Sequence, residues 1–433
     1  MKVRVLLWVL LGAALLGLFL FLAFSGPRVI DVKSSKANVL DSAEESLIDL
    51  ELQTNIAPTS TSSSTNPPVL PTGVNSDIPN QPQLASPPAV IKSVYATGWS
   101  AGSASQINHL VDLINQTELN AIIIDIKDYS GFVSYHISSP LIQESGADKE
   151  IRILQPNILI KRLHDNGIYV IARISTFQDG ILAVAHPEWA LKDKTTGKIW
   201  RDNKGLAWMD PTSKNVWDYN IAIARDALSR GFDEINFDYV RFPSDGGLSR
   251  IEFPVWDQKK PMDLAIKDFF KYLRENLGQA KLSADLFGLT TVDYTDLGIG
   301  QIIENAFPYF DYIDPMVYPS HYASGAFGLK KPALYPYEVV KNSITVAVKR
   351  LIKYNQPALP VTSSSIATST PKIKEDYGVR AKIRPWLQDF DLGMVYDAKA
   401  VRAQITASDE GGGSGWMLWD PRNVYTREAL LTQ

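Results

Sequence analysis

Residues 232–243 have the sequence FDEINFDYVRFP, which directly follows a helical pattern ending at Gly231. Its alternation predicts a strand with Ile235, Phe237 and Tyr239 on one side and Asn236, Asp238 and Val240 on the other. Gly231 suits a helix C-cap, and Pro243 ends the strand. A buried carboxylate is costly unless it is paired, so we expect Asp238 at the mouth of a pocket. The structural alternative is an ion pair between Asp238 and Arg241 that closes the strand end.

The composition is that of a globular protein large enough for one big domain with flanking segments. The chain has 433 residues, of which 45% are hydrophobic and 21% charged, and its net charge is −4. This charge does not indicate a nucleic-acid-binding surface. The absence of cysteine excludes disulfides, thiolate zinc sites and a cysteine nucleophile. The ten Trp and eighteen Tyr offer flat faces suited to stacking on sugars, besides their usual packing role.

The N-terminal region predicts a membrane anchor followed by a tether. Lys2 and Arg4 precede an uncharged apolar run from Val5 to Phe24, about the length that spans a bilayer. We therefore predict a transmembrane signal-anchor over residues 1–26, with the rest of the chain extracytoplasmic. A cleaved signal peptide, which would make the protein secreted, is the alternative, although its apolar region is normally about 7–15 residues. Residues 27–89 are rich in Pro, Ser and Thr and predict a disordered linker.

From residue 90 to residue 433 the chain alternates strand patterns with helix patterns. Besides the opening stretch, strands are predicted over 93–99, 121–126, 169–176, 281–287, 312–318, 383–390 and 415–419. Helices are predicted over 104–116, 158–165, 214–230, 262–277, 302–307, 337–354 and 398–408. Eight strands alternating with helices predict a (β/α)8 TIM barrel. A doubly wound sheet would need a glycine-rich phosphate turn, which Gly98 and Gly102 do not make.

Polar and aromatic residues gather where the predicted strands end, which is where such barrels place their active sites. They are Asp125, Lys127 and Asp128; Arg173 and Ser175; Asp238 and Arg241; Asp285; Tyr318 and His321; Gln388 and Asp389; and Trp416, Trp419 and Asp420. We predict substrate contacts from Asp125, Lys127, Asp128, Arg173, Arg241, Tyr318, His321, Asp389, Trp416 and Trp419. Because Trp416 and Trp419 are three apart, they should point to opposite faces of a regular strand.

Five segments of the predicted barrel together resemble a known family. They are IARIS at 171–175, WMDP at 208–211, FDYVRFP at 237–243, DPMVYPSHY at 314–322 and GWMLWD at 415–420. In this order they look like the bacterial putative glycosyl hydrolase domain family of the TIM-barrel glycosidase superfamily. The resemblance extends over about residues 93–425 and implies a TIM barrel that hydrolyses glycosidic bonds.

Glycoside hydrolysis usually needs two carboxyl groups beside the scissile bond. Asp238 is our candidate for the nucleophile or base, with Arg241 or Arg173 as the cation that keeps it ionised. Asp285 is the candidate for the second carboxyl group, the acid, and the alternative for it is an ion pair with Lys127 or Arg173. The placement on the fourth and fifth strands is similar to that in many sugar-cleaving barrels, which is an analogy of fold. A third carboxylate, Asp389 or Asp128, would bind sugar hydroxyls.

Other chemistries have weaker support in the sequence. His109, His136, His164 and His186 lack the spacing of metal ligands, so we expect no metal, no other cofactor and no metal-dependent deacetylase. Gly411-Gly412-Gly413-Ser414-Gly415 approaches a strand and does not form the nucleophile elbow of a serine hydrolase.

The sequence therefore predicts a membrane-tethered glycoside hydrolase that acts on an extracellular or cell-envelope polysaccharide. The alternative is a non-catalytic barrel that binds glycan at the cell surface, which the aromatic strand ends also fit. The two are distinguished by whether Asp238 has a carboxyl partner at a catalytic separation, roughly 5–5.5 Å for retention or 6.5–9.5 Å for inversion.

Overall fold

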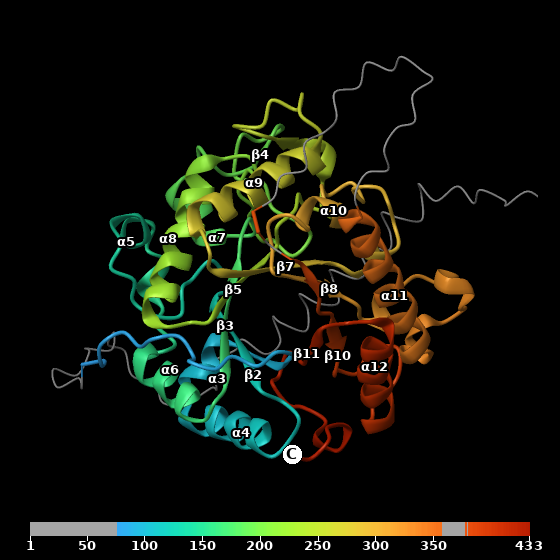
Figure 1. Cartoon of the computed structure of the whole chain (residues 1–433). Helices are drawn as coiled ribbons and strands as arrows, with labels where there is room; N and C mark the ends of the chain where they lie inside the picture. The colour runs from blue at the N-terminus through green and yellow to red at the C-terminus, as the bar shows by residue number, and fades with distance from the viewer. Residues whose placement is uncertain (1–75, 357–376, 379) are drawn as a thin grey trace, which may run out of the picture.

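The computed structural model describes residues 76–356, 377–378 and 380–433, and in it parallel strands close into a barrel surrounded by helices (Figure 1). The barrel strands are β1 (Ile91–Ala96), β2 (Ala121–Lys127), β3 (Tyr169–Ser175), β5 (Glu234–Asp238), β7 (Lys281–Phe287), β8 (Tyr312–Met316), β9 (Lys382–Ile383), β10 (Trp386–Gln388) and β11 (Gly415–Trp419). The short strands β9 and β10 share the seventh position. Strand β10 pairs with both β8 and β11, and β11 pairs with β1, which closes the ring. The predicted eight-stranded parallel barrel is confirmed.

The helices connect these strands on the outside of the barrel. They are α3 (Gly98–Gly102), α4 (Ala104–Asn115), α5 (Pro140–Ser145), α6 (Pro156–Asp165), α7 (Gly180–Ala185), α8 (Lys214–Arg230), α9 (Met262–Leu277), α10 (Ile303–Ala306), α11 (Pro336–Asn355) and α12 (Ala398–Gly411). Helix α8 ends at Gly231, whose φ of 106° is left-handed, as its predicted C-cap role requires. A small antiparallel pair, β4 (Lys192–Asp193) and β6 (Ile251–Glu252), lies among the loops.

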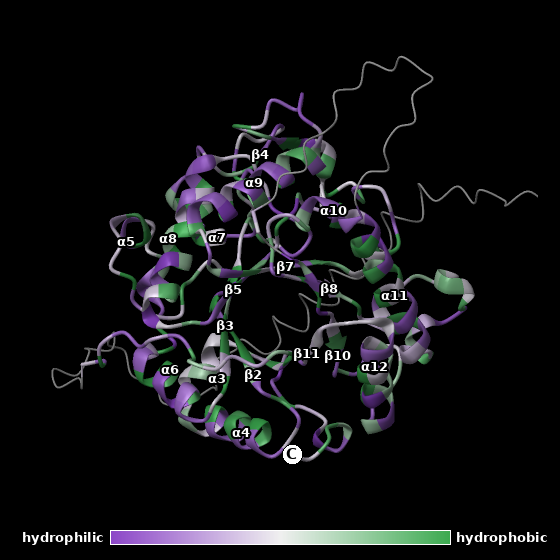
Figure 2. Ribbon diagram, in the orientation of Figure 1, coloured by the Kyte–Doolittle hydropathy of each residue, from purple (hydrophilic) through white to green (hydrophobic). Residues whose placement is uncertain are grey.

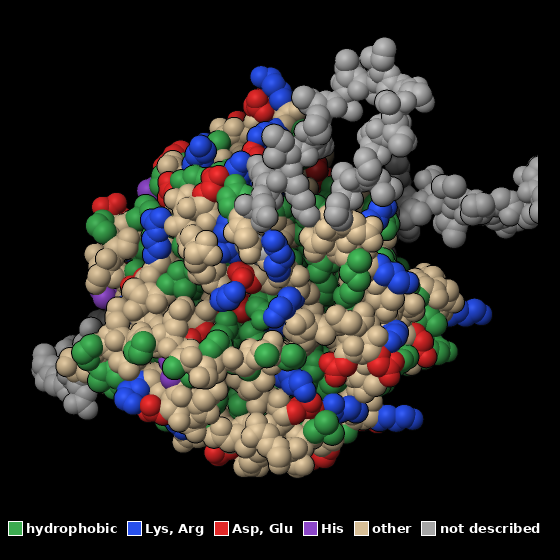
Figure 3. Space-filling model, viewed as in Figure 1, with side chains coloured by type: hydrophobic (Ala, Val, Ile, Leu, Met, Phe, Trp, Pro, Cys, Tyr) green, Lys and Arg blue, Asp and Glu red, His purple; other side chains and the backbone are tan. Residues whose placement is uncertain are grey.

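Short 3₁₀ helices complete the loops. They are η1 (Ala147–Lys149), η2 (Leu248–Arg250), η3 (Gly288–Thr291), η4 (Pro319–His321), η5 (Ala326–Gly328), η6 (Pro332–Leu334) and η7 (Arg427–Ala429). The helices turn apolar residues toward the strands and polar residues outward (Figure 2). On the face shown in Figure 3, acidic and basic side chains are interspersed.

Strand β5 follows the predicted alternation up to its last residue. Ile235 and Phe237 are fully buried in the core between strands and helices, whereas the polar side chains Asn236 and Asp238 point into the barrel. The strand ends at Asp238, two residues earlier than the alternation suggested. Tyr239 has a φ of +52°, a left-handed conformation that is uncommon for a non-glycine residue. This turn brings the Tyr239 ring to the pocket described below.

The predicted seventh strand is divided in two. Residues 383–390 were expected to form one strand, but β9 and β10 are separated by Arg384 and Pro385. Proline has no N–H to contribute to the ladder, so the regular pairing stops there. The interruption leaves Arg384 and Trp386 as inward-pointing side chains.

The last part of the predicted linker is bound to the barrel. The carboxylate of Asp77 accepts hydrogen bonds from the first backbone N–H groups of α6, at 2.9 Å from Asn157 and 3.2 Å from Ile158. Farther along, the N–H of Leu84 donates to Asp233 at 2.6 Å, and the Leu84 side chain packs against the barrel interior. The prediction of a disordered linker up to residue 89 therefore has to be corrected for residues 77–84, because Asp77 and Leu84 are hydrogen-bonded to the barrel.

The predicted transmembrane segment over residues 1–26 and the predicted linker up to residue 75 lie outside the described residues. Among the described residues, no helix combines the length and the hydropathy needed to cross a bilayer. The membrane anchor remains a prediction from the sequence.

Candidate active site

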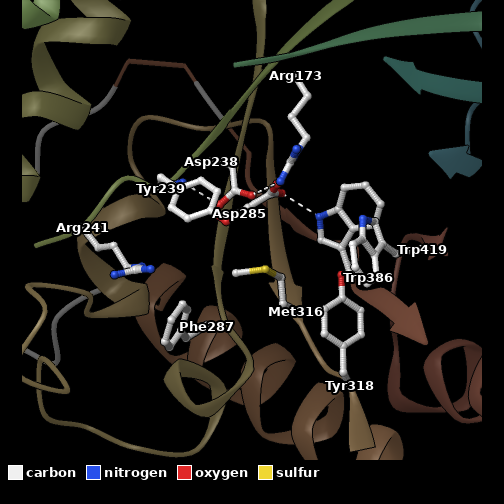
Figure 4. Close-up of a pocket in the computed structure, with 10 residues that line it drawn as sticks. All are labelled: Arg173, Asp238, Tyr239, Arg241, Asp285, Phe287, Met316, Tyr318, Trp386 and Trp419. Atoms are coloured by element: carbon white, nitrogen blue, oxygen red, sulfur yellow. Dashed lines mark hydrogen bonds and ion pairs between the residues drawn. The ribbon is translucent and has the colours of Figure 1, made fainter. Parts of the chain in front are cut away.

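A pocket opens at the carboxyl ends of the barrel strands (Figure 4). It is lined by Arg173, Asp238, Tyr239, Arg241, Asp285, Phe287, Met316, Tyr318, Trp386 and Trp419. These residues come from β3, β7, β8, β10 and β11, from the end of β5, and from the segments that follow β5 and β8. This is the end of the barrel at which the sequence predicted the site.

Arg173 is the centre of the site. Its Nη1 lies 2.6 Å from Oδ1 of Asp125, its Nη2 donates a hydrogen bond to Oδ2 of Asp238, and its Nε lies 3.5 Å from Oδ2 of Asp285. The hydroxyl of Tyr95 donates to the other oxygen of Asp125 at 2.5 Å. Three carboxyl groups therefore share one guanidinium, and all four side chains are at most 7% exposed. Burying three negative charges beside one positive charge favours protonation of at least one carboxyl group.

Asp285 is the carboxyl group with the least favourable surroundings for a charge. Burial raises its pKa well above the ordinary value, and the nearby charge of Asp238 raises it further, against the lowering effect of Arg173. Its Oδ1 accepts hydrogen bonds from Nδ2 of Asn236 at 2.9 Å and from Nε1 of Trp386 at 2.7 Å. Its Oδ2 is buried and has no hydrogen-bond partner among the described residues. The site therefore favours the neutral, protonated form of Asp285.

Asp238 is held by an ion pair and by a backbone hydrogen bond. Besides its ion pair with Arg173, its Oδ1 accepts the backbone N–H of Tyr239 at 2.5 Å. The cation that meets Asp238 is thus Arg173, the second of the two expected. Arg241 instead lies with its guanidinium over the rings of Trp208, Tyr239 and Phe287, 4.7–5.5 Å from their centroids. The proposed strand-closing pair of Asp238 with Arg241 is not the arrangement that the structure shows.

A second charged layer lies deeper in the barrel. Nη2 of Arg384 lies 2.6 Å from Glu234 and 2.7 Å from Asp314, and all three side chains are fully buried. Burial raises the pKa of Asp314 to about 7, despite the neighbouring Arg384. The Asn236 amide joins this layer to the site, because its Nδ2 lies 2.9 Å from Asp285 and 3.3 Å from Asp314.

Aromatic rings form one wall of the pocket. Tyr318 and Trp419 lie with ring centroids 5.8 Å apart, and Trp419 and Tyr95 lie 6.2 Å apart. Trp419 belongs to the cluster inside the barrel, whereas Trp416 is fully buried in the core that faces the helices. The predicted opposite orientation of the two indoles is confirmed, and only Trp419 lines the pocket.

Lys127 and Asp128 lie outside the pocket. The pairing register of β2 shifts between Asp125 and Lys127, and such an irregularity redirects the side chains that follow it. The Lys127 ammonium is fully buried at 2.7 Å from Asp179, and Asp128 lies 2.5 Å from Arg152. To contact a substrate, Lys127 or Asp128 would have to line the pocket. The structure instead places both side chains in ion pairs outside it.

His321 and Asp389 lie beside the pocket, outside its lining. The His321 ring is 5.5 Å from the ring of Tyr318, and burial lowers its pKa to about 3, so it is neutral at physiological pH. Asp389 accepts hydrogen bonds from the N–H and the hydroxyl of Thr426, at 3.0 and 2.6 Å. Asp125 is likewise held by Tyr95 and Arg173, so it positions the guanidinium.

Several residues of the site were not predicted. The pocket also includes Tyr239, Phe287, Met316 and Trp386, and the layer beneath it includes Glu234, Asn236, Asp314 and Arg384. The period of two along the strands is the signal that could have identified part of this set. It places Glu234 and Asn236 on the same side as Asp238, and Trp386 on the same side as Gln388. Among the described residues, no three His, Asp or Glu side chains are arranged to hold a metal ion.

Comparison with known proteins supports a glycoside hydrolase type of function. The family described as "putative glycosyl hydrolase domain" matches residues 93–425. No curated protein matches the sequence. The structures similar to this chain include a glycoside hydrolase domain and an α-galactosidase.

Three solved structures illustrate the range of likeness. A hypothetical protein from Ruminiclostridium thermocellum is 42% identical, with a TM-score of 0.41, and the match covers 44% of this chain and 96% of that one. The glycoside hydrolase domain of PgaB (BpsB) from Bordetella bronchiseptica is 12% identical over 77% of this chain and 95% of that one, with a TM-score of 0.52. The α-galactosidase TtGalA from Thermus thermophilus is 13% identical over 81% and 61% of the two chains, with a TM-score of 0.47. The PgaB domain shares the fold of this chain.

Proposed function

Because the chain belongs to the putative glycosyl hydrolase domain family, we propose that it hydrolyses glycosidic bonds with Asp238 and Asp285 as the two catalytic carboxyl groups. The observation that carries the proposal is that both groups contact the guanidinium of Arg173 at the floor of one pocket. One of them is in an ion pair, and the other is in surroundings that favour the protonated form. Two carboxyl groups with opposite protonation are what the reaction requires.

In the proposed reaction Asp285 is the general acid. It transfers its proton to the glycosidic oxygen as the bond from that oxygen to the anomeric carbon breaks. Asp238, which is paired with Arg173, acts on the anomeric carbon as a nucleophile or as the base that activates water. Water supplies the hydroxyl group of the new sugar end, and its remaining proton restores Asp285.

The walls of the pocket supply sugar binding in this proposal. Tyr318, Trp386 and Trp419 offer ring faces for the apolar side of a pyranose. Arg241 lines the opposite part of the pocket and offers N–H donors to sugar hydroxyls.

We also propose that the substrate is an extracellular or cell-envelope polysaccharide and that residues 1–26 anchor the protein to the membrane. The support is the uncharged apolar run from Val5 to Phe24, which follows Lys2 and Arg4. A Pro-, Ser- and Thr-rich tether between anchor and barrel would let the pocket reach a polymer outside the membrane.

Release of reducing ends from cell-wall and exopolysaccharide preparations tests the function. The full chain is compared with Asp238→Asn, Asp285→Asn and a control, Asp226→Asn, which removes a carboxylate of α8 that pairs with Arg230. We expect release by the parent and by the control, and none by the two pocket variants when circular dichroism shows them folded. Equal release by Asp238→Asn would remove Asp238 from the mechanism. Retention of glycan without any release would favour the binding barrel instead.

A further inference from the structure

The two oxygens of the Asp285 carboxyl group have very different surroundings. Oδ1 accepts two N–H groups, from Trp386 at 2.7 Å and from Asn236 at 2.9 Å. Oδ2 is buried with no hydrogen bond among the described residues, and Nε of Arg173 lies 3.5 Å from it. Figure 4 shows the Trp386 nitrogen directed at Asp285 from the side of the aromatic wall.

The donors on Oδ1 determine which oxygen can carry a proton. The indole nitrogen of Trp386 and the amide nitrogen of Asn236 can donate hydrogen bonds but cannot accept them. A proton on Oδ1 would therefore meet two N–H groups with no acceptor, so the neutral acid keeps its proton on Oδ2. Both donors are held in place, since Trp386 is 2% exposed and Asn236 is fully buried.

We propose that Trp386 is a positioning residue for the catalytic acid: with Asn236 it reserves Oδ1 of Asp285 as an acceptor and leaves Oδ2 to carry the transferred proton. This inference rests on the proposed function, because it assigns a partner to the acid named there. It also links binding to catalysis. The indole of Trp386 also lines the pocket. A sugar that packs on this ring therefore contacts the same side chain that donates the hydrogen bond to Asp285.

The proposal predicts a change in pH dependence. The charged groups that face Asp285 are Arg173 on β3, Asp238 on β5 and Asp314 on β8, and Trp386→Phe leaves all three in place. An N–H donor favours the ionised form of a carboxyl group, so its removal increases the proton affinity of Asp285. Since the acid must be protonated to act, the basic limb of the rate profile moves to higher pH.

The test measures kcat and KM against pH for the full chain, for Trp386→Phe, and for Trp419→Phe, which removes an indole from the same wall. Trp386→Phe is expected to lower kcat roughly tenfold or more and to move the basic limb up by about one pH unit. Trp419→Phe is expected to raise KM and to leave the limb in place. A Trp386→Phe profile with the parent's limb and kcat would overturn the proposal while the proposed function stood.

A second measurement does not depend on turnover. The carboxyl-carbon NMR signal of Asp285, assigned by its loss in Asp285→Asn, is titrated in the parent and in Trp386→Phe. Its midpoint is expected about one pH unit higher in the variant. An unchanged midpoint contradicts the proposal, even if the parent hydrolyses none of the glycans tried. If Trp386→Phe does not fold, Asn236→Ala removes the other donor to the same oxygen and is expected to shift the midpoint in the same direction.

Discussion

The interior of the barrel has two halves with different chemistry. The strands β5, β7, β8 and the break between β9 and β10 direct polar groups inward along their length: Glu234, Asn236, Asp238, Ser283, Asp285, Asp314 and Arg384. On β11, β1, β2 and β3 the inward residues are mainly apolar: Met417, Ile91, Tyr95, Ala121, Ile123 and Ile171. This second half becomes charged only toward the mouth, with Asp125 and Arg173.

The outward faces of the two halves do not differ in this way. Ile235 and Phe237 of β5 join the same apolar core as Ile122 and Ile124 of β2, with no exposed surface. Packing against the helices thus explains the fold in both halves, and it does not require charges inside. In the described interior, five carboxyl groups share the guanidinium groups of Arg173 and Arg384. Burying such an excess of charge costs stability, so its presence indicates a functional requirement.

The largest expected effect is on the hydrolysis rate of a variant in the half formed by β5, β7, β8 and the break between β9 and β10, where the rate and the stability should respond differently. Asp238→Asn should lower the hydrolysis rate at least about a thousandfold, because the nucleophile or base is lost. The substitution also removes one negative charge from an interior in which buried carboxyl groups outnumber guanidinium groups. The free energy of unfolding at pH 7 should therefore stay the same or rise by about 1 kcal/mol. Reducing-sugar release and urea denaturation measure the two quantities. A variant that loses several kcal/mol would show that Asp238 is structural.

In the deeper charged layer, loss of the shared cation should lower the free energy of unfolding strongly, whereas loss of one of its anions should lower it little. Arg384→Met leaves Glu234 and Asp314 buried without their counter-charge and should lower the free energy of unfolding at pH 7 by about 3–5 kcal/mol. Asp314→Asn leaves one anion per cation in this layer and should cost less than about 1 kcal/mol. Both values come from urea denaturation of the full chain.

The pH dependence of the Arg384→Met effect follows from the same charges. In the parent the pKa of Asp314 is about 7, above the unfolded value of about 4, so its ionised form costs stability as the pH rises through that interval. Without Arg384 this cost increases. The loss caused by Arg384→Met should therefore be smaller at pH 5 than at pH 7. If Arg384→Met lowers the free energy of unfolding equally at pH 5 and pH 7, packing and not charge stabilises the layer of Arg384, Glu234 and Asp314.

The features that the sequence predicts are those that depend on residues close together along the chain. The bounds of α8, α9, β7 and β11 follow from periodicity and from the residues that end the elements, and the structure agrees with them residue by residue. The meeting of Arg173, Asp238 and Asp285 follows from their positions at the ends of parallel strands. These predictions need only the alternation of each strand and the geometry of a barrel.

Features that depend on contacts between strands could not be predicted. The alternation does not show that the register shifts after Asp125, which turns Lys127 away from the pocket. Nor does it identify Arg173 as the partner of Asp238, because Arg241 is nearer in sequence. The alternation could have placed Trp386 on the inward side, but its hydrogen bond to Asp285 and the break at Pro385 exist only in the folded barrel.

A mutation in the apolar half should have an effect that does not depend on pH. Ile123 of β2 is fully buried inside the barrel, so Ile123→Ala removes packed methyl groups and should cost about 2–4 kcal/mol. Ile123→Val should cost about 0.5–1.5 kcal/mol. No charge changes in either variant. Urea denaturation at pH 5 and at pH 7 should therefore give the same loss, in contrast to Arg384→Met. A loss that depends on pH would show that the two halves are electrostatically coupled.

The smallest expected effect concerns residues 77–84, where Leu84 packs against the apolar residues inside the barrel. The Leu84 side chain is partly buried against that cluster, and its N–H is held by Asp233. Leu84→Ala keeps the backbone hydrogen bond and loses apolar contact, so it should cost about 1 kcal/mol, less than a fully buried leucine would. Pro82→Ala, at an exposed position two residues away, is the control and should stay within about 0.5 kcal/mol. Equal stability of Leu84→Ala and the parent would mean that residues 77–84 lie on the barrel without contributing to its stability.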